Sequence, residues 1–131
     1  ISERQKERKP VLGDLPLVKI AIAPSDRAVL HRRIERRLAA MMDAGFLDEV
    51  RRLHAGGTLT PDMPSVRTVG YRQLWGHLDG EYGLEEAVER SLVATRQLAK
   101  RQMTWLRSLP GTHWLESSDE NLLEMRIEAL C

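Results

Sequence analysis

The feature that most constrains this chain is an unbroken helical pattern from Leu84 to Leu109. No glycine or proline interrupts it before Pro110 and Gly111, and a helix of this length spans about 40 Å. A helical wheel separates an apolar face from a basic stripe. The apolar face holds Leu84, Val88, Leu92, Thr95, Ala99 and Leu106, and the stripe holds Arg96, Lys100 and Arg107. Such a helix can pack on a core and still present charge to a polyanion, so nucleic acid is the first partner to consider.

Composition narrows the class of protein. The 131 residues suit one domain or part of one, and the net charge of +1 means that any affinity for nucleic acid must come from clustered charges. The single cysteine, Cys131, excludes an internal disulfide. No apolar run is long enough to cross a membrane and no signal peptide begins the chain, so we expect a cytoplasmic protein without membrane contact. Because the chain begins at Ile1 in a polar run, we expect the C-terminal part of a longer protein.

Elsewhere the sequence predicts mostly helix with one or two strands. Leu17–Ala23 is a short apolar segment between prolines, typical of a buried strand. This strand either joins a sheet whose other strands lie outside the chain or pairs with His113–Glu116, and we favour the first. The predicted helices are Asp26–Ala44, capped by Ser25 and ended by Gly45, then Phe46–His54, Tyr71–Leu78, the long helix and Asp119–Leu130. Residues 1–16 are predicted to be a linker or the end of a helical insertion, and residues 17–131 one mainly helical domain.

Within the helix Asp26–Ala44, Arg33 and Arg37 lie near the edge of the predicted apolar face, one turn apart. That face holds Leu30, Ile34, Leu38 and Met41, whereas Arg32 and Arg36 lie toward water. Guanidinium groups match the oxygens of phosphate, so this pair suits a phosphate clamp. The alternative is that both side chains extend to solvent or pair with carboxylates such as Asp48 or Glu49.

A second candidate site lies where a proline-containing loop enters the helix Tyr71–Leu78. It comprises Arg67, Thr68, Val69, Gly70, Tyr71 and Arg72. Gly70 would permit close approach of a ligand, free N–H groups at the helix start attract anions, and the arginines suit phosphate. Tyr71 offers a stacking face for a base. The alternative is an ordinary junction with Tyr71 and Trp75 packed in the core.

Other kinds of site find no support in the sequence. The four histidines do not have the spacing of metal ligands, so no metal site made of protein ligands is predicted. No phosphate-binding loop of the G-x-x-x-x-G-K-[ST] type occurs, and no Ser/His/Asp arrangement is indicated. These residues therefore suggest phosphate and nucleic-acid contact without a candidate catalytic base.

Three segments together resemble the C-terminal part of bacterial tRNA dimethylallyltransferases, also called tRNA isopentenyltransferases. They are IAIAPSDRAVLHRRIERRLAAMMDAGFLDEV, the loop MPSVRTVGYRQLW and ATRQLAKRQMTWLR, in the family's order and spacing. The resemblance covers about Val18 to Leu115, and Met63-Pro64 replaces the family's usual leucine–proline pair.

The resemblance implies transfer of the dimethylallyl group of dimethylallyl diphosphate to N6 of the adenosine 3′ of the anticodon, with Mg²⁺ accompanying the diphosphate. It implies a P-loop-kinase-like α/β core, a three-layer fold with a parallel sheet, of which this chain lacks the N-terminal half. The phosphate-binding loop and the aspartate proposed as base lie in that half. We therefore expect no catalytic residue here, no activity from this chain alone, and a monomeric enzyme.

The resemblance also implies roles for individual residues. Arg37 and Arg33 correspond to arginine positions that hold the donor's diphosphate. Two stretches correspond to parts of the family that face tRNA. The first is Arg67, Thr68, Val69, Gly70, Tyr71 and Arg72, and the second is Thr95, Arg96, Gln97, Lys100 and Arg101. Trp105 is expected to pack rather than bind.

Two alternatives stay open at this point. A freestanding helical RNA-binding module could use the same basic stripe, although the isolated strand Leu17–Ala23 argues against it. A related adenylate prenyltransferase acts on a free nucleotide, but the ATRQLAKRQ segment favours a polynucleotide.

Overall fold

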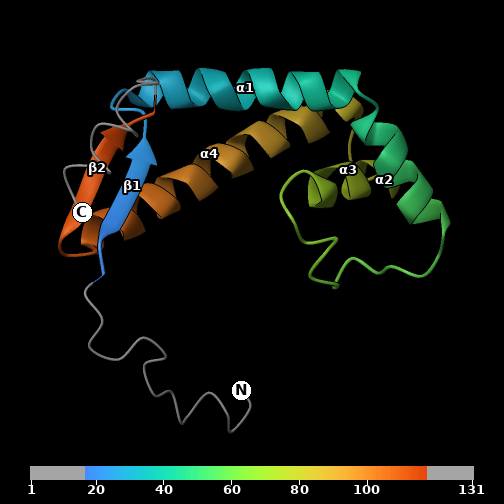
Figure 1. Cartoon of the computed structure of the whole chain (residues 1–131). Coiled ribbons are helices and arrows are strands. Elements are labelled where there is room, and N and C mark those ends of the chain that lie inside the picture. The colour runs from blue at the N-terminus through green and yellow to red at the C-terminus, as the bar shows by residue number, and fades with distance from the viewer. Residues whose placement is uncertain (1–16, 118–131) are drawn as a thin grey trace, which may run out of the picture. The chain divides into compact units, whose positions relative to one another are not determined.

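The computed structural model describes residues 17–117. In chain order its elements are β1 (Lys19–Ala23), α1 (Arg27–Asp43), α2 (Phe46–Ala55), α3 (Tyr71–Leu78), α4 (Leu84–Ser108) and β2 (Thr112–Glu116), shown in Figure 1. Each predicted element in this range is therefore confirmed, with small shifts at its ends. The predicted helix Asp119–Leu130 and the predicted linker Ile1–Pro16 lie outside the described residues.

The chain forms two compact units, one that contains β1 and β2 and another that comprises Pro24–Leu109. In the first, β1 and β2 are parallel, with Lys19 opposite Thr112 and Ala23 opposite Glu116. The ammonium of Lys19 also donates to the carbonyl of Pro110 at 2.9 Å. The strand Leu17–Ala23 thus has a partner within the chain, which is the pairing that we did not favour from the sequence.

Helix α1 begins at a different cap from the one predicted. Asp26, not Ser25, is the N-cap, because its backbone is extended and its carboxylate accepts a hydrogen bond from the N–H of Ala28 at 2.8 Å. The predicted stop at Gly45 is confirmed. Gly45 has a φ of +92°, and its N–H donates to the carbonyl of Met42 at 3.0 Å.

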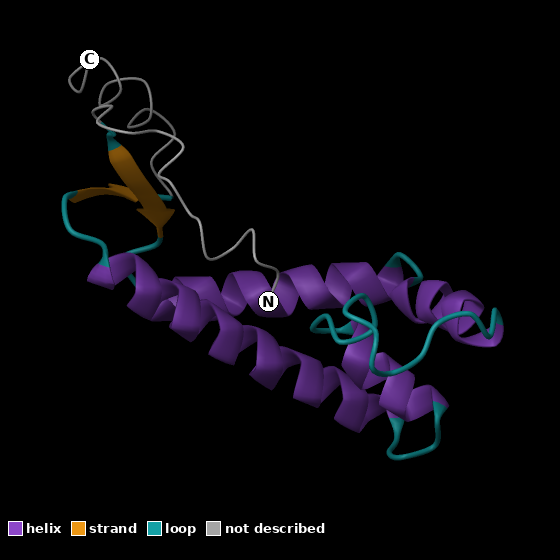
Figure 2. Ribbon diagram, turned by 90° about the horizontal axis from the view of Figure 1, so that it is seen from below, coloured by secondary structure: helices purple, strands orange, loops and turns teal. Residues whose placement is uncertain are grey.

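Helices α1 and α4 run alongside each other within the second unit (Figure 2). An ion pair between Glu35 of α1 and Arg96 of α4 links them. The predicted apolar face of α1 is half-buried, and no residue of α1 is fully buried because the helix packs mainly against α4 in the described part of the chain. None of the helices between residues 17 and 117 is both long enough and apolar enough to span a membrane.

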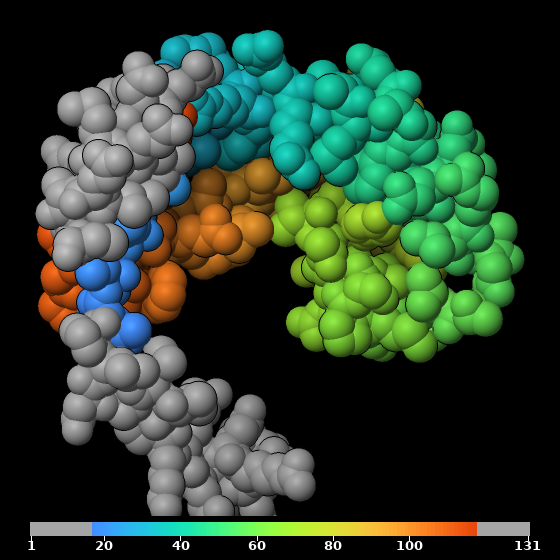
Figure 3. Space-filling model, in the orientation of Figure 1, coloured from blue at the N-terminus to red at the C-terminus, as the bar shows by residue number. Residues whose placement is uncertain are grey.

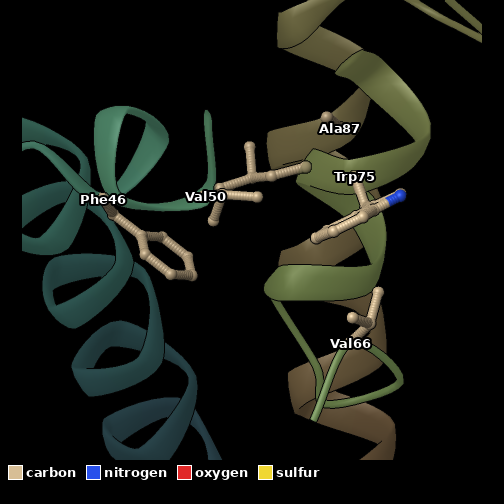
Figure 4. Close-up of a cluster of buried hydrophobic side chains, with 6 residues drawn as sticks. Phe46, Val50, Val66, Trp75 and Ala87 are labelled. Atoms are coloured by element: carbon tan, nitrogen blue, oxygen red, sulfur yellow. The ribbon is translucent and has the colours of Figure 1, made fainter. Parts of the chain in front are cut away.

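The core lies where α2, α3 and the start of α4 meet (Figure 4). It consists of Phe46, Val50, Val66, Leu74, Trp75 and Ala87. Leu53, although apolar and on α2, lies outside this core and is 38% exposed. Trp75 is buried in the core, as expected if the start of α3 is an ordinary junction between a loop and a helix. This core fixes the position of α3 and of the loop before it.

Gly70 sets the angle at which that loop enters α3. Its φ is +93°, a conformation that side-chain-bearing residues rarely adopt. A Cβ at this position would lie 3.1 Å from two ring atoms of Phe46. Gly70 thus permits close approach of the backbone to the ring of Phe46 in the core, in place of the close approach to a ligand that we predicted. The residues on either side, Arg67 and Arg72, depend on this junction for their placement.

Candidate nucleic-acid interface

Candidate residues of α3, of the loop before it and of α4 line three hollows on the surface of the Pro24–Leu109 unit. The largest, which we call the loop groove, has a volume of about 730 Å³ and lies between the loop before α3, α3 itself and α4. The space-filling view shows the surface hollowed between the green loop and α3 region and the orange α4 (Figure 3). Its charged and amide-bearing lining residues are Asp62, Arg67, Arg72, Gln73, Asp79, Glu81, Arg90 and Gln97.

The loop groove carries charges of both signs. Asp79 accepts from His54 at 2.8 Å, and Arg90 pairs with Glu86 at 2.6 Å while stacking 4.1 Å over the ring of Tyr82. Arg67 and Arg72 are exposed beside the carboxylates of the groove. A polyanion in this groove would therefore be attracted by these two arginines and repelled by the acidic residues.

The second hollow, which we call the tryptophan hollow, lies along α4 and has a volume of about 580 Å³. It is lined by Gln97, Lys100, Arg101, Thr104, Trp105 and Ser108. The expectation that Trp105 packs is wrong for the described structure, because its side chain is 62% exposed. An exposed indole that lines the same hollow as Lys100 and Arg101 is a surface suited to stacking a base beside bound phosphates.

The third hollow, which we call the two-helix hollow, lies between the start of α1 and the second half of α4. Its volume is about 180 Å³. It is lined by Pro24, Ser25, Arg27, Leu30, His31, Arg96, Ala99, Lys100, Met103, Thr104 and Arg107. The predicted stripe of Arg96, Lys100 and Arg107 is confirmed here, since all three side chains line one hollow. No carboxylate is among the lining residues that the structure describes.

Shared residues join the three hollows along α4. Gln97 lines both the loop groove and the tryptophan hollow, and Lys100 and Thr104 line both the tryptophan hollow and the two-helix hollow. Acidic side chains line only the first of the three. The result is a surface track whose basic character increases toward the C-terminal end of α4.

The start of α3 is less open to ligands than the sequence suggested. The N–H of Gly70 donates to Oε1 of Gln73 at 2.8 Å, and the N–H of Arg72 donates to the carbonyl of Thr68 at 3.0 Å. The hydroxyl of Thr68 donates to the carbonyl of Pro64 at 3.3 Å, and Val69 is half-buried. The predicted free N–H groups at Gly70 and Arg72 are therefore already bonded.

Tyr71 is held as a structural residue. Its ring meets that of Phe46 edge to face with centroids 5.1 Å apart, and its hydroxyl donates to the carboxylate of Glu49. This hydrogen bond raises the pKa of Tyr71 above the usual 10.0, and burial and the negative charge of Glu49 raise it further. Stacking of Tyr71 on a base would therefore compete with its contacts to Phe46 and Glu49.

The raised pKa of Tyr71 leads to a titration prediction. The difference in tyrosinate absorbance between the parent chain and Tyr71→Phe should have its inflection above 10.0, and Glu49→Gln should move it back down. Because the folded pKa is the raised one, the bond stabilises the fold at lower pH and is lost as pH rises through that pKa. An inflection unchanged in Glu49→Gln would contradict this assignment.

The predicted second stretch on α4 divides between two surfaces. Thr95 is half-buried and its hydroxyl donates to the carbonyl of Ser91 at 2.7 Å. Arg96 turns toward α1 and pairs with Glu35. Gln97 and Arg101 lie on the tryptophan hollow, and Lys100 lies at its junction with the two-helix hollow.

Arg33 and Arg37 are both exposed on α1, as are Arg32 and Arg36. The helical wheel placed Arg33 and Arg37 closer to the apolar face than the other two arginines, but all four side chains are exposed in the structure. Neither Arg33 nor Arg37 lines any of the three hollows. The carboxylates considered as alternative partners have other contacts, Asp48 with Arg51 and Glu49 with Tyr71. The structure thus places the proposed donor arginines apart from the track.

Three basic residues that were not predicted as site residues also line the hollows. Arg27 and His31 of α1 join the two-helix hollow, and Arg90 joins the loop groove. The i,i+4 spacing of Arg27 and His31 was a visible signal, and the Nε of Arg27 does donate to the imidazole of His31 at 3.3 Å. What the sequence could not indicate was the packing of this turn beside α4.

A protein-built metal site cannot be assigned to this part of the molecule. Among residues 17–117, no three or more His, Cys, Asp or Glu side chains converge in a way that could hold a metal ion. Any Mg²⁺ would need ligands from a substrate or from other residues.

Comparison with known proteins connects these features to a family. Residues 1–109 match the family model described as IPP transferase. The full-length tRNA isopentenylpyrophosphate transferase of Bacillus halodurans is 34% identical, with a TM-score of 0.78 over 87% of this chain and 37% of that one. The tRNA delta(2)-isopentenylpyrophosphate transferase of Staphylococcus epidermidis is 32% identical, with a TM-score of 0.71 over 89% of this chain and 37% of that one. The chain thus spans little more than a third of the length of these solved structures.

Proposed function

The chain belongs to the IPP transferase family, and from this we propose that the enzyme that carries it prenylates tRNA. Specifically, we propose transfer of a dimethylallyl group from dimethylallyl diphosphate to N6 of the adenosine 3′ of the anticodon. The observation that supports a polynucleotide acceptor is the track of three hollows along α4, joined through Gln97 and Lys100. A free nucleotide would need only one of these hollows.

In the proposed reaction, the bond between the prenyl carbon and the diphosphate oxygen breaks and a bond from that carbon to N6 forms. N6 loses a proton, and diphosphate leaves. The part of Arg33 and Arg37 is to bind the diphosphate and to stabilise the negative charge that grows on it. No residue of this chain is proposed as the base, which we place in the N-terminal half of the family fold.

We propose Mg²⁺ as the counter-ion of the diphosphate, bound mainly by the substrate and by residues before this chain. The absence of a convergent acidic cluster among residues 17–117 means that the described residues do not fit such an ion by themselves. No step assigned to Arg33 or Arg37 therefore depends on a metal held by this chain.

We further propose that β1 and β2 belong to a larger parallel sheet of a P-loop-kinase-like core in a monomeric cytoplasmic enzyme. Ile20 and Ile22 of β1 are 39% and 52% exposed, and Trp114 of β2 is 38% exposed. Parallel sheets are normally covered on both faces, so apolar side chains of this kind support the presence of further covering structure.

The test is a comparison of acceptors with the intact enzyme. We expect prenyl transfer from dimethylallyl diphosphate to an anticodon stem-loop and not to adenylate, with the product identified by mass spectrometry of the nucleosides. Transfer to adenylate alone would support the adenylate prenyltransferase instead. Binding of the stem-loop without any transfer would support an RNA-binding module.

The basic residues of the track lead to a salt-dependence prediction. Arg72→Gln and Arg101→Gln should each weaken binding of the stem-loop and reduce the slope of log K against log salt by roughly 0.7–0.9, because each phosphate contact releases counter-ions. Fluorescence anisotropy at several salt concentrations measures this slope. Arg52→Gln is the matched control, since Arg52 is exposed on α2 and lines none of the three hollows. Equal slopes in all three variants would exclude the track as the RNA surface.

A further inference from the structure

The two-helix hollow adds basic residues from the start of α1 and the end of α4 to Arg96 and Lys100, which were already assigned to the tRNA-facing stretch. Arg27 comes from the first turn of α1, and Arg96, Lys100 and Arg107 come from the second half of α4, with Arg107 two turns after Lys100. His31, one turn after Arg27, adds an imidazole whose Nε2 accepts from the Nε of Arg27 at 3.3 Å. A volume of about 180 Å³ is ample for a group of several heavy atoms, given that a cavity needs only about 10–15 Å³ to hold one water.

The nearby carboxylates already have partners. Asp26 accepts from the N–H of Ala28 at the start of α1, and Glu35 pairs with Arg96. Arg27, Lys100 and Arg107 are exposed and line the hollow without a carboxylate among its lining residues in the described chain. Repulsion among these cations is reduced when an anion sits between them.

Arg96 provides a second, independent observation. One of its terminal nitrogens pairs with Glu35, but its Nε is buried without a hydrogen-bond partner among the described residues. Buried donors of this kind are rare in folded proteins and call for an acceptor. The pairing with Glu35 also fixes the guanidinium beside α1, so its remaining donors are already positioned.

We propose that the two-helix hollow is a phosphate-binding subsite formed by Arg27, His31, Arg96, Lys100 and Arg107. Forked guanidinium donors from both helices would surround the phosphate oxygens, with the lysine ammonium as a further charge. The phosphate is one of the nucleic-acid backbone, because Lys100 and Thr104 are shared with the tryptophan hollow and the subsite therefore continues the track. This last assignment rests on the proposed function, whereas phosphate binding itself does not.

The first test uses inorganic phosphate and the 131-residue chain. We expect added phosphate, at constant ionic strength made up with chloride, to shift the NMR signals of residues that line the hollow. Arg27→Gln and Arg107→Gln should each weaken this binding by about tenfold, the usual effect of removing one charge-assisted hydrogen bond. Arg36→Gln, the same change at an exposed position of α1 outside the hollow, should have no effect.

The possible results separate clearly. Shifts that disappear in Arg27→Gln and Arg107→Gln but persist in Arg36→Gln support the subsite. Absence of shifts in the parent chain, or equal weakening in all three variants, would overturn it. If Arg27→Gln loses helicity by circular dichroism, Arg107→Gln near the end of α4 provides the same test, and Arg107→Lys should restore part of the affinity.

A second measurement with the intact enzyme distinguishes the source of the phosphate. For a backbone phosphate, Arg107→Gln weakens binding of the anticodon stem-loop and leaves the KM for dimethylallyl diphosphate unchanged. A raised KM with unchanged stem-loop binding would overturn the assignment to RNA and place the donor's diphosphate in the hollow. An enzyme that transfers no prenyl group but whose chain binds phosphate as described would refute the proposed function and keep the subsite.

Discussion

Arg37→Gln in the intact enzyme should lower kcat/KM for dimethylallyl diphosphate by about 100- to 1000-fold. This is the usual loss when one donor to a charge that develops in the transition state is removed. Glutamine keeps most of the length of the side chain but removes the positive charge and the fork that matches two phosphate oxygens. Steady-state rates of prenyl transfer at varied donor concentration, with the stem-loop saturating, measure the effect.

The neighbouring arginines of α1 provide the control for this experiment. Arg36 is exposed on the same helix, so Arg36→Gln makes the same change in net charge and should alter the rate less than twofold. Arg33 lies one turn before Arg37, and Arg33→Gln should show a loss in the same direction as Arg37→Gln. A rate for Arg37→Gln equal to that of Arg36→Gln would remove Arg37 from the donor site.

Gly70→Ala should lower the free energy of unfolding by about 2–6 kcal/mol. With φ at +93° and ψ at −60°, the backbone of Gly70 lies in a region that residues with a Cβ rarely populate, which costs about 1–3 kcal/mol. Contact of that Cβ with Phe46 at 3.1 Å adds the cost of overpacking a core, about 1–3 kcal/mol. Because Arg67 and Arg72 flank this junction, binding of the stem-loop should weaken as well. Chemical denaturation followed by circular dichroism measures the stability.

Gly45→Ala is the control without a core contact. Gly45 also has a positive φ, +92°, but its ψ of +27° places it in the left-handed helical region, and a Cβ there would meet no heavy atom within 4 Å other than those of its chain neighbours. This variant should therefore lose only the cost of a left-handed backbone, about 1–2 kcal/mol, and bind RNA normally. Equal losses in Gly45→Ala and Gly70→Ala would show that neither the contact with Phe46 nor the different ψ of Gly70 adds to that cost.

Local patterns were sufficient to predict the helices. The apolar spacing and the glycines fixed the ends of α2, α3 and α4 to within a residue, because these signals act over a few neighbouring positions. The errors lay where two candidates compete for one role. Asp26 rather than Ser25 caps α1, and β1 pairs with β2, the alternative that we did not favour from the sequence.

The site was predicted less completely because it is built across helices. The wheel of α4 correctly grouped Arg96, Lys100 and Arg107, since that grouping depends on one helix alone. It could not show that Glu35 of α1 holds Arg96, or that Arg27 and His31 complete the hollow. The same holds for two aromatic residues. Tyr71, predicted to stack on a base, is held by Phe46 and Glu49, and Trp105, predicted to pack, is exposed.

The parallel pairing of β1 with β2 has a consequence for how the chain folds. The bond from Lys19 to Pro110 spans 91 residues, and closing a flexible loop of that size costs about 4 kcal/mol in chain entropy. Within the helical unit, however, Pro24 and Arg107 line the same hollow, so its two ends already lie close together once it has folded. Pairing of the two strands then requires closure of only a short loop. We expect the helices to assemble first and the strands to pair last, and opening of the strand pair to leave the helical unit folded.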